Sequence, residues 1–183
     1  MKIFIKRAAD VLLAGGVITC PTEGVYGLSC LPDDDDAVVR LLALKRRDPG
    51  KGLILIAANA GQLEDWIDLE GETLPRPEAG RPITWIVRAQ AGVSPLVRGD
   101  HDTIAVRITT NPVAREICLS VESPLVSTSA NIAGQPVARN IYVLRRRFTA
   151  CVDYIVPAKC GPAAGPSEIR ELKSKQVLRP GRA

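Results

Sequence analysis

Short apolar runs alternate with helical segments along almost the whole chain, and this alternation limits the folds open to it. Runs rich in Val, Ile and Leu predict strands, at residues 17–20, 52–58, 83–89, 103–108, 124–128, 152–156 and 176–179. Amphipathic spacing predicts helices near residues 5–13, 34–47, 60–69, 111–119 and 138–148. Such alternation is typical of an α/β fold with a twisted, mixed parallel and antiparallel sheet flanked by helices.

Local signals also predict where helices begin and end. Asp34 or Asp35 is a candidate N-cap for the second helix, and Asn111 followed by Pro112 is a candidate start for the fourth. The pair Gly15-Gly16 predicts a left-handed end of the first helix. The Pro- and Gly-rich stretch 71–82 is expected to be a loop, because neither side of it is large enough to fold comfortably alone. We therefore expect one domain over residues 1–183.

Composition argues against several classes of protein. The five cysteines form no C-x-x-C pair and their number is odd, as expected for reduced cysteines in a cytoplasmic protein. No apolar stretch approaches the roughly 20 residues of a membrane helix, and the first residues show no basic segment followed by an apolar one, so we expect neither membrane spanning nor secretion. The single histidine, His101, lies in a polar GDHD segment. This composition argues against a zinc site and against a histidine-dependent nucleophile. We expect the chemistry to rest on lysine, arginine, hydroxyls and backbone dipoles.

Two segments in the first third of the chain could form part of an anion site. In PTEGVYGL, Thr22 and Glu23 follow a buried strand, where ligands of open α/β sheets tend to bind. The alternative is a loop in which Thr22 only bonds its own backbone. In KRRDPGK, a cluster of cations surrounds a Pro-Gly turn and indicates an anion. A solvated helix end with favourable dipole interactions would have the same pattern.

Two later segments carry hydroxyls and arginines. SPLVSTSAN delivers Ser127, Thr128 and Ser129 at the end of an apolar strand, which suits close approach to phosphate or ribose but also an ordinary turn. In the tail, the loop GPAAGPS precedes Ser167 and a later strand, and it could close over a pocket or simply connect a hairpin. The strand TIAVRI ends in an arginine that needs an anionic partner if it is buried.

Taken in order, PTEGVYGL, the cation cluster, KGLILIAAN, TIAVR, VSTSANIAGQP and PSEIR resemble the YrdC family of threonylcarbamoyl-AMP synthases, in its single-domain form. The resemblance runs from about residue 7 to residue 180. It implies a YrdC-like fold with a central basic cavity. It also implies a cytoplasmic nucleotidyltransferase that joins L-threonine, bicarbonate and ATP into L-threonylcarbamoyladenylate and pyrophosphate. The product would serve threonylcarbamoyl modification of adenosine 37 in tRNAs that read codons starting with A.

The resemblance also implies roles for individual residues. Three positions match threonine contacts, namely Thr22, Arg107 and Ser167. Seven match the ATP side, namely Lys45, Arg47, Lys51, Thr103, Ser129, Asn131 and Arg179. Mg²⁺ is expected to arrive on the ATP phosphates rather than in a protein cage. Further partners would be tRNA or the downstream threonylcarbamoyl transferase complex, and Glu23 is the nearest candidate for a base.

The chain departs from the family pattern at three places. Gly80-Arg81-Pro82 replaces the usual Pro-Gly-Pro, the loop 161–167 lacks basic residues, and Gly24 stands where threonine or alanine is common, which predicts added flexibility. An RNA-binding or ribosome-maturation module using the same basic cavity is the main alternative function, motivated also by the arginine triplet 145–147. Its weakness is an aromatic content of only 4%. Hydrolysis of an acyl or carbamoyl phosphate would use the same anion pocket.

Overall fold

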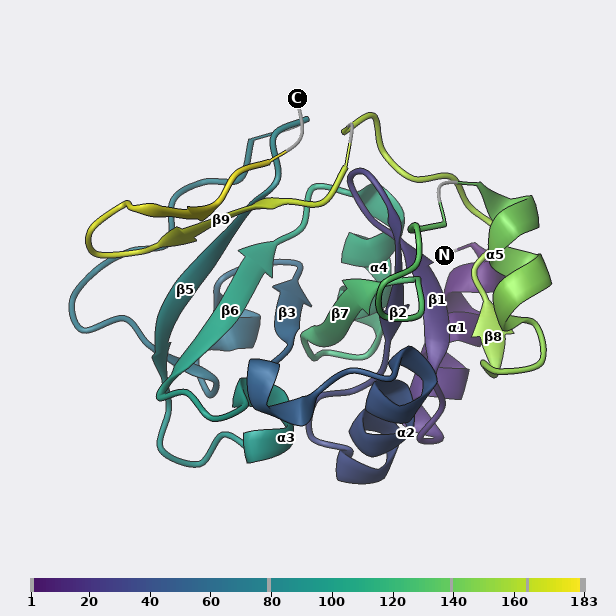
Figure 1. Ribbon diagram of the computed structural model, residues 1–183, viewed down its shortest axis with the longest axis horizontal. Coiled ribbons are helices and arrows are strands. Elements are labelled where there is room, and N and C mark those ends of the chain that lie inside the picture. Colours follow the sequence, from purple (N-terminus) through teal and green to yellow (C-terminus); the bar gives the residue numbers. More distant parts are fainter. Residues whose placement is uncertain (1, 79, 139, 164, 182–183) are drawn as a thin grey trace.

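A single continuous sheet organises the chain. The computed structural model describes residues 2–78, 80–138, 140–163 and 165–181, so the predicted domain limits at 1 and 183 lie outside the described residues. Within that part, ten strands form one sheet in the order β10-β9-β5-β6-β3-β7-β2-β1-β8, with β4 paired to β5 (Figure 1). The strands are β1 (Ile18–Pro21), β2 (Tyr26–Ser29), β3 (Ile54–Ala57), β4 (Ile67–Asp68), β5 (Ile83–Ala89), β6 (Thr103–Ile108), β7 (Leu125–Ser129), β8 (Tyr154–Ile155), β9 (Glu168–Glu171) and β10 (Val177–Arg179). The helices are α1 (Ile3–Leu13), α2 (Asp35–Lys45), α3 (Pro95–Arg98), α4 (Pro112–Ser120) and α5 (Ile141–Phe148), with 3₁₀ turns η1 (Pro49–Lys51) and η2 (Gly61–Leu63).

The sheet is mixed, as the alternation of strands and helices predicts. Strand β3 runs parallel to β6 and antiparallel to β7, while β5 runs parallel to β9 and antiparallel to β6. Because paired residues point to the same face, the register places Ile54, Ala105 and Ser127 side by side in one row across three strands. The predicted fold class is confirmed.

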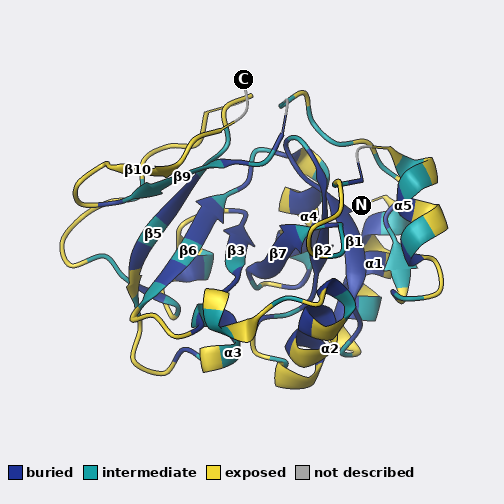
Figure 2. Ribbon diagram, in the orientation of Figure 1, coloured by how far each residue is buried: buried dark blue, intermediate teal, exposed yellow. Residues whose placement is uncertain are grey.

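The central strands of the sheet are largely buried (Figure 2), and apolar side chains pack on both faces of the sheet. On one face, α1 and α4 pack Leu12 and Ile117 against Ile56 and Leu125. On the other, α2 and α5 belong to a cluster that includes Leu55 and Val126 from the same two central strands. Successive residues of one strand thus enter opposite clusters, which is the two-sided burial expected of central strands.

The predicted helix ends are confirmed. Asp34 caps α2 by accepting a hydrogen bond from the Ala37 amide at 2.9 Å, and Asn111 caps α4 by accepting from the amides of Val113 and Ala114 at 3.0 and 3.2 Å. Gly15 follows α1 with φ +77°, as a left-handed helix end requires. Among the described residues, no helix has the length and apolar character needed to cross a membrane.

Three expectations about secondary structure are wrong. Residues 60–69 do not form one helix: η2 ends after a single turn, and Ile67 instead pairs with Ala89 at the open edge of β5. The segment after Thr22 is not only a loop, since β2 returns antiparallel to β1. Strand β9 also escaped prediction, because its sequence EIRE lacks the apolar pattern and forms through pairing with β5 and β10.

Candidate active site

A cavity of about 230 Å³ lies over the row of Ile54, Ala105 and Ser127. Its walls come from segments far apart in the sequence: the turn 22–25 after β1, the segment 47–53 after α2, strand β7, and the chain from 165 to 169. Ser127, Thr128 and Ser129 all line it, so the hydroxyls at the end of β7 face the same space. The structure therefore brings the four predicted segments to one place.

Four cations line this cavity, namely Arg47, Lys51, Arg107 and Arg179. Arg47 donates to the Gly52 carbonyl from Nε at 3.1 Å and from Nη2 at 2.8 Å, which fixes its guanidinium beside η1. Arg179 donates from Nη2 to the Ser167 carbonyl at 2.8 Å. Burial and the positive charges of Arg107 and Arg47 lower the pKa of Arg179 below its ordinary value. Guanidiniums this close to one another favour a bound anion between them.

Arg107 pairs with Glu23, which among the described residues is the one carboxylate that lines the cavity. Its Nη2 lies 3.3 Å from Glu23 Oε2, and both side chains are almost fully buried. Glu23 also accepts hydrogen bonds from the Thr109 hydroxyl at 2.6 Å and the Thr110 amide at 2.9 Å. Burial alone would raise the pKa of Glu23, but Arg107 and these donors hold it below the ordinary value. Both hydrogen bonds reach Oε1, whereas the buried Oε2 has only the ion-pair contact with Arg107 among the described residues. An ionised carboxylate whose pKa is lowered is a poor proton acceptor, so the structure gives Glu23 the task of holding Arg107.

The three predicted threonine contacts lie together. The Thr22 hydroxyl donates to the Val25 carbonyl at 2.7 Å, which is the local backbone bond that the alternative interpretation of this segment predicts. Thr22 nevertheless lines the cavity. Ser167 Oγ lies 2.7 Å from Thr84 Oγ1, and Arg107 Nη1 donates to that same threonine oxygen at 3.4 Å. Thr84, which the sequence marked only as a strand residue, thus links the arginine to the loop that carries Ser167.

Lys45 and Asn131 stand in the wall behind the cavity. Lys45 Nζ lies 2.6 Å and 3.1 Å from the carbonyl and hydroxyl of Ser129, and 2.8 Å from Asn131 Oδ1. Burial, together with the charge of Arg47, lowers the pKa of Lys45 to about 8. These bonds fix the turn that presents Ser129, so the geometry supports a positioning role; direct contact of Lys45 or Asn131 with ATP stays a prediction.

Thr103 lies at the start of β6, two positions before Ala105 and therefore on the same face of that strand. It lines a neighbouring depression with Ile86, which also belongs to the main cavity. A nucleotide whose phosphates lie among the arginines could extend along β6 toward Thr103. His101 is exposed in a bend. Among the described residues, no three His, Cys, Asp or Glu side chains gather as a metal site would require.

The segment that follows β8 crosses directly over the site. The amide of Gly161 donates to the Thr22 carbonyl at 2.8 Å, and that of Ala163 to the Glu23 carbonyl at 2.9 Å. A Cβ on Gly24 would come within 2.4 Å of the Gly165 carbonyl. The interpretation of Gly24 as a source of flexibility is therefore wrong: it makes room for the crossing chain, which we call the strap (residues 158–163 and 165–167).

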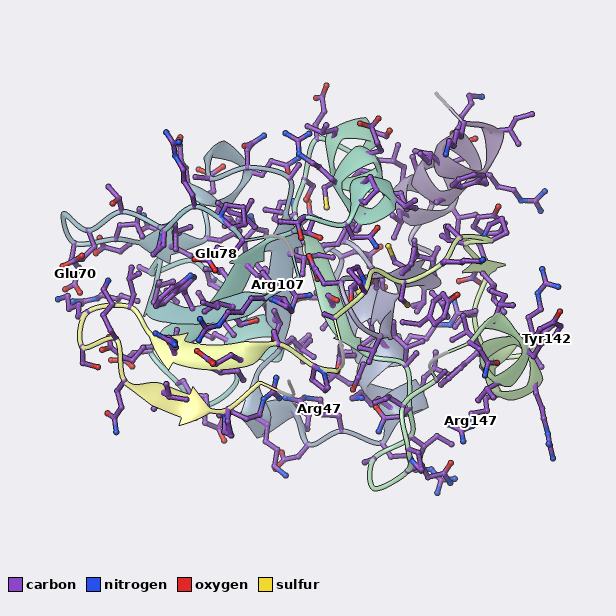
Figure 3. All side chains as sticks on the ribbon, turned by 90° about the horizontal axis from the view of Figure 1, so that it is seen from above. Arg47, Glu70, Glu78, Arg107, Tyr142 and Arg147 are labelled. Atoms are coloured by element: carbon purple, nitrogen blue, oxygen red, sulfur yellow. The ribbon has the colours of Figure 1, made fainter. Side chains whose placement is uncertain are left out.

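Figure 3 shows Arg107 near the middle of the molecule, with Arg47 facing the same region and Tyr142 and Arg147 at one edge. Arg147 belongs to the arginine triplet of α5, where it donates to the Pro136 carbonyl. Tyr142 is 80% exposed. The arginine triplet is thus a separate surface and contributes nothing to the lining of the main cavity among the described residues.

Comparisons with known proteins agree on one family. The family model Sua5_yciO_yrdC, described as "Telomere recombination", matches residues 10–181. The threonylcarbamoyl-AMP synthase of Nitrosococcus oceani is 45% identical over 178 residues, covering 96% of this chain and 96% of its own. That of Cellvibrio japonicus is 44% identical over 180 residues, covering 96% and 95%.

Solved structures share the fold. P. abyssi Sua5 complexed with L-threonine superposes with a TM-score of 0.86 at 27% identity, and the match covers 97% of this chain. This chain spans only 54% of that protein. E. coli YciO superposes with a TM-score of 0.78 at 24% identity, covering 97% of this chain and 88% of its own.

Proposed function

The chain belongs to the Sua5/YciO/YrdC family, and from that premise we propose that it is a threonylcarbamoyl-AMP synthase, a nucleotidyltransferase that uses L-threonine, bicarbonate and ATP. The observation that carries the proposal is the convergence of Arg47, Lys51 and Arg179 with Arg107 on one cavity. Two anions, a carbamate and a triphosphate, must meet for this reaction. A protein that catalyses it has to screen their charges and orient them, which is what such a cavity can do.

The threonine side would be the end of the cavity around Arg107. One guanidinium edge faces Glu23, while the wall beside it offers the hydroxyls of Thr22 and Ser167. Because the Thr22 hydroxyl donates to Val25, its lone pairs are free to accept from the amino group of threonine. Arg107 would hold the threonine carboxylate. This division keeps the amine near hydroxyls and the carboxylate on a cation.

The ATP side would begin at Arg47, Lys51 and Arg179, with Ser129 at the end of β7 and Thr103 farther along β6. Mg²⁺ would enter on the triphosphate as part of the substrate. The amine of threonine attacks the carbon of bicarbonate, so that a C–N bond forms and water leaves. An oxygen of the resulting carbamate then attacks the α-phosphorus, and the bond to the bridging oxygen breaks to release pyrophosphate.

We also propose that the product is consumed in the cytoplasm, where it supplies the threonylcarbamoyl group of adenosine 37 in tRNAs reading codons that start with A. A mixed carbamoyl–phosphate anhydride is prone to hydrolysis. Its transfer to a downstream transferase complex, or to tRNA bound there, therefore has to be rapid. The strap over Thr22 and Glu23 is suited to excluding water until that transfer.

The experiment is release of pyrophosphate from MgATP by the purified protein, with mass spectrometry of the nucleotide product. We expect release only when threonine and bicarbonate are both present. Release that is unaffected by omitting threonine would instead favour hydrolysis of an acyl phosphate or of ATP. Absence of release, together with RNA affinity that falls steeply with salt, would favour the RNA-binding alternative.

A further inference from the structure

A second cavity, of about 250 Å³, meets the first one at Glu23, Pro82 and Arg107, which line both. Its other walls are the loop 74–81, strand β5 from Ile83, and the end of β6. Glu78 of that loop, labelled in Figure 3, lines this cavity together with Arg107. Apart from Arg107 and Glu23, which holds it, the described residues of this cavity have no role in the proposed binding of ATP or threonine.

The two cavities lie on opposite faces of the sheet. Ile86 and Ala105, which pair with each other, line the first cavity. Trp85 and Val106, the next pair along the same two strands, line the second. Because neighbouring residues of a strand point to opposite faces, the second cavity opens behind the floor of the first.

The two cavities adjoin at the end of the β5–β6 ladder. The paired positions of these two strands end at Trp85 and Val106. Arg107 follows Val106 directly and lines both cavities, and its Nη1 donates to the Thr84 hydroxyl of β5 at 3.4 Å. Arg107 therefore lies where the two cavities adjoin.

Arginines surround the outer mouth. Arg76, Arg81 and Arg170 line the second cavity together with Glu78. Glu168 engages two of them, Arg170 through Nε and Arg81 through Nη2 at 3.8 Å. Arg76 is exposed and has no ion pair within the part of the chain that the structure describes. Glu78 in the same lining carries the opposite charge, but Arg81 and Arg170 share the one carboxylate of Glu168. Among the described residues, the mouth therefore retains a net positive charge to which Arg76 contributes.

Arg107 itself offers an unused donor at this junction. Nη1 donates to Thr84 and Nη2 faces Glu23, but Nε is buried without a hydrogen-bond partner among the described residues. A buried donor left unpaired costs free energy, so its presence in a native site calls for a ligand or a water. The arginine is only 7% exposed, and the second cavity reaches it.

We propose that this second cavity is the entry site for the small oxyanion substrate, bicarbonate, which reaches threonine past Arg107, where the two cavities adjoin, while ATP fills the first cavity. The proposal rests on the proposed function. A first cavity of about 230 Å³ is already smaller than typical small-molecule sites of about 300–1,000 Å³. A separate inlet lets the third substrate reach the amine after the two larger ones have bound.

The test is Arg76→Glu, which reverses the exposed charge at the mouth and leaves the first cavity intact. We expect kcat/KM for bicarbonate to fall about three- to tenfold and to depend less on ionic strength. The KM values for threonine and ATP should stay unchanged. Arg115→Glu is the matched control, because Arg115 is an exposed residue of α4 that lines neither cavity. It should leave all three constants as they are.

A second variant, Ile83→Phe, narrows the inlet from within and should also raise KM for bicarbonate, while calorimetric threonine binding shows that the fold persists. Equal kcat/KM values for bicarbonate in Arg76→Glu and Arg115→Glu would overturn the proposal. That result is expected if the substrate enters as neutral CO₂ or if it enters through the first cavity, because neither route depends on the charge of Arg76. A proportional rise of all three Michaelis constants would overturn it as well. Absence of bicarbonate-dependent pyrophosphate release from the unmodified protein would instead overturn the proposed function.

Discussion

Arg107 is the residue at which the proposed threonine and ATP sides can be separated by mutation. We expect Arg107→Ala to raise KM for threonine by about ten- to a hundredfold, the equivalent of one or two charge-assisted hydrogen bonds, with a smaller effect on ATP. Lys51→Ala should do the reverse, because Lys51 lines the cavity from η1. Steady-state kinetics with each substrate varied in turn measures both. Equal effects of each variant on the two substrates would contradict this partition.

Glu23 supports a prediction about stability. Glu23→Gln leaves the Arg107 charge buried without its partner, so the free energy of unfolding at pH 7 should fall by about 3–5 kcal/mol. The double variant Glu23→Gln/Arg107→Met, which removes both charges, should recover much of this loss without recovering threonine binding. Urea unfolding measures the stability, and a double variant less stable than Glu23→Gln would contradict the ion pair.

The same ion pair fixes a pH dependence. The pKa of Glu23 is lower in the folded protein than in the unfolded chain, where it is about 4.3. Its contribution to stability is therefore complete above that value and is lost as the pH falls through the folded-state pKa. The difference in unfolding free energy between the unmodified protein and Glu23→Gln should shrink below about pH 4.

Sequence could identify most residues of this site but not what each contacts. Thr22, Arg107 and Ser167 belong to motifs, and the structure brings them to one cavity. Thr109 and Thr110, which fix Glu23, are two polar residues that directly follow a strand. Their position after a strand was a signal, but their shared partner, Glu23, lies 86 and 87 residues away along the chain. Such pairing depends on the assembled sheet.

At the scale of elements, apolar periodicity was a good guide where a segment packs on the core. It predicted α1, α4 and β3, whose buried faces follow regular spacing. It failed for β4 and β9, short polar strands that form because the edges of β5 offer unpaired backbone groups. Tertiary pairing overrides local preference at such edges.

The strap over the site allows an element-scale prediction. In Gly24→Ala, the new Cβ would lie within 2.7 Å of the Ala163 carbonyl, so the strap must move and carry Ser167 with it. We expect KM for threonine to rise about tenfold and trypsin to cleave after Lys159 faster than in the unmodified protein. Gly92→Ala is the control, since a Cβ there meets nothing within 4 Å. Unchanged cleavage in Gly24→Ala would show that the strap does not depend on this close approach.

Across the whole molecule, the site exists only because one sheet joins segments from both ends of the chain. The cavity takes Thr22 from the edge of β1 and Arg179 from the last strand, which lie near opposite ends of the strand order (Figure 1). Alternating strands and helices predicted the fold class, whereas the strand order could not be derived from local pattern. The predicted single domain over residues 1–183 stays a prediction, and it has a direct test.

The distribution of aromatic and helical residues provides that test. Both tryptophans lie toward the β10 end of the strand order: Trp66 comes just before β4, and Trp85 lies on β5. The helices α1, α4 and α5 lie toward the other end of the sheet, where β1 and β8 are (Figure 1). Tryptophan fluorescence and helical circular dichroism therefore report on different halves of the molecule. If the chain is one cooperative unit, their thermal transitions should coincide, and MgATP with threonine should raise both midpoints equally. Separate transitions, or a ligand shift confined to one probe, would show instead that the halves fold independently and that the cavity forms by their docking.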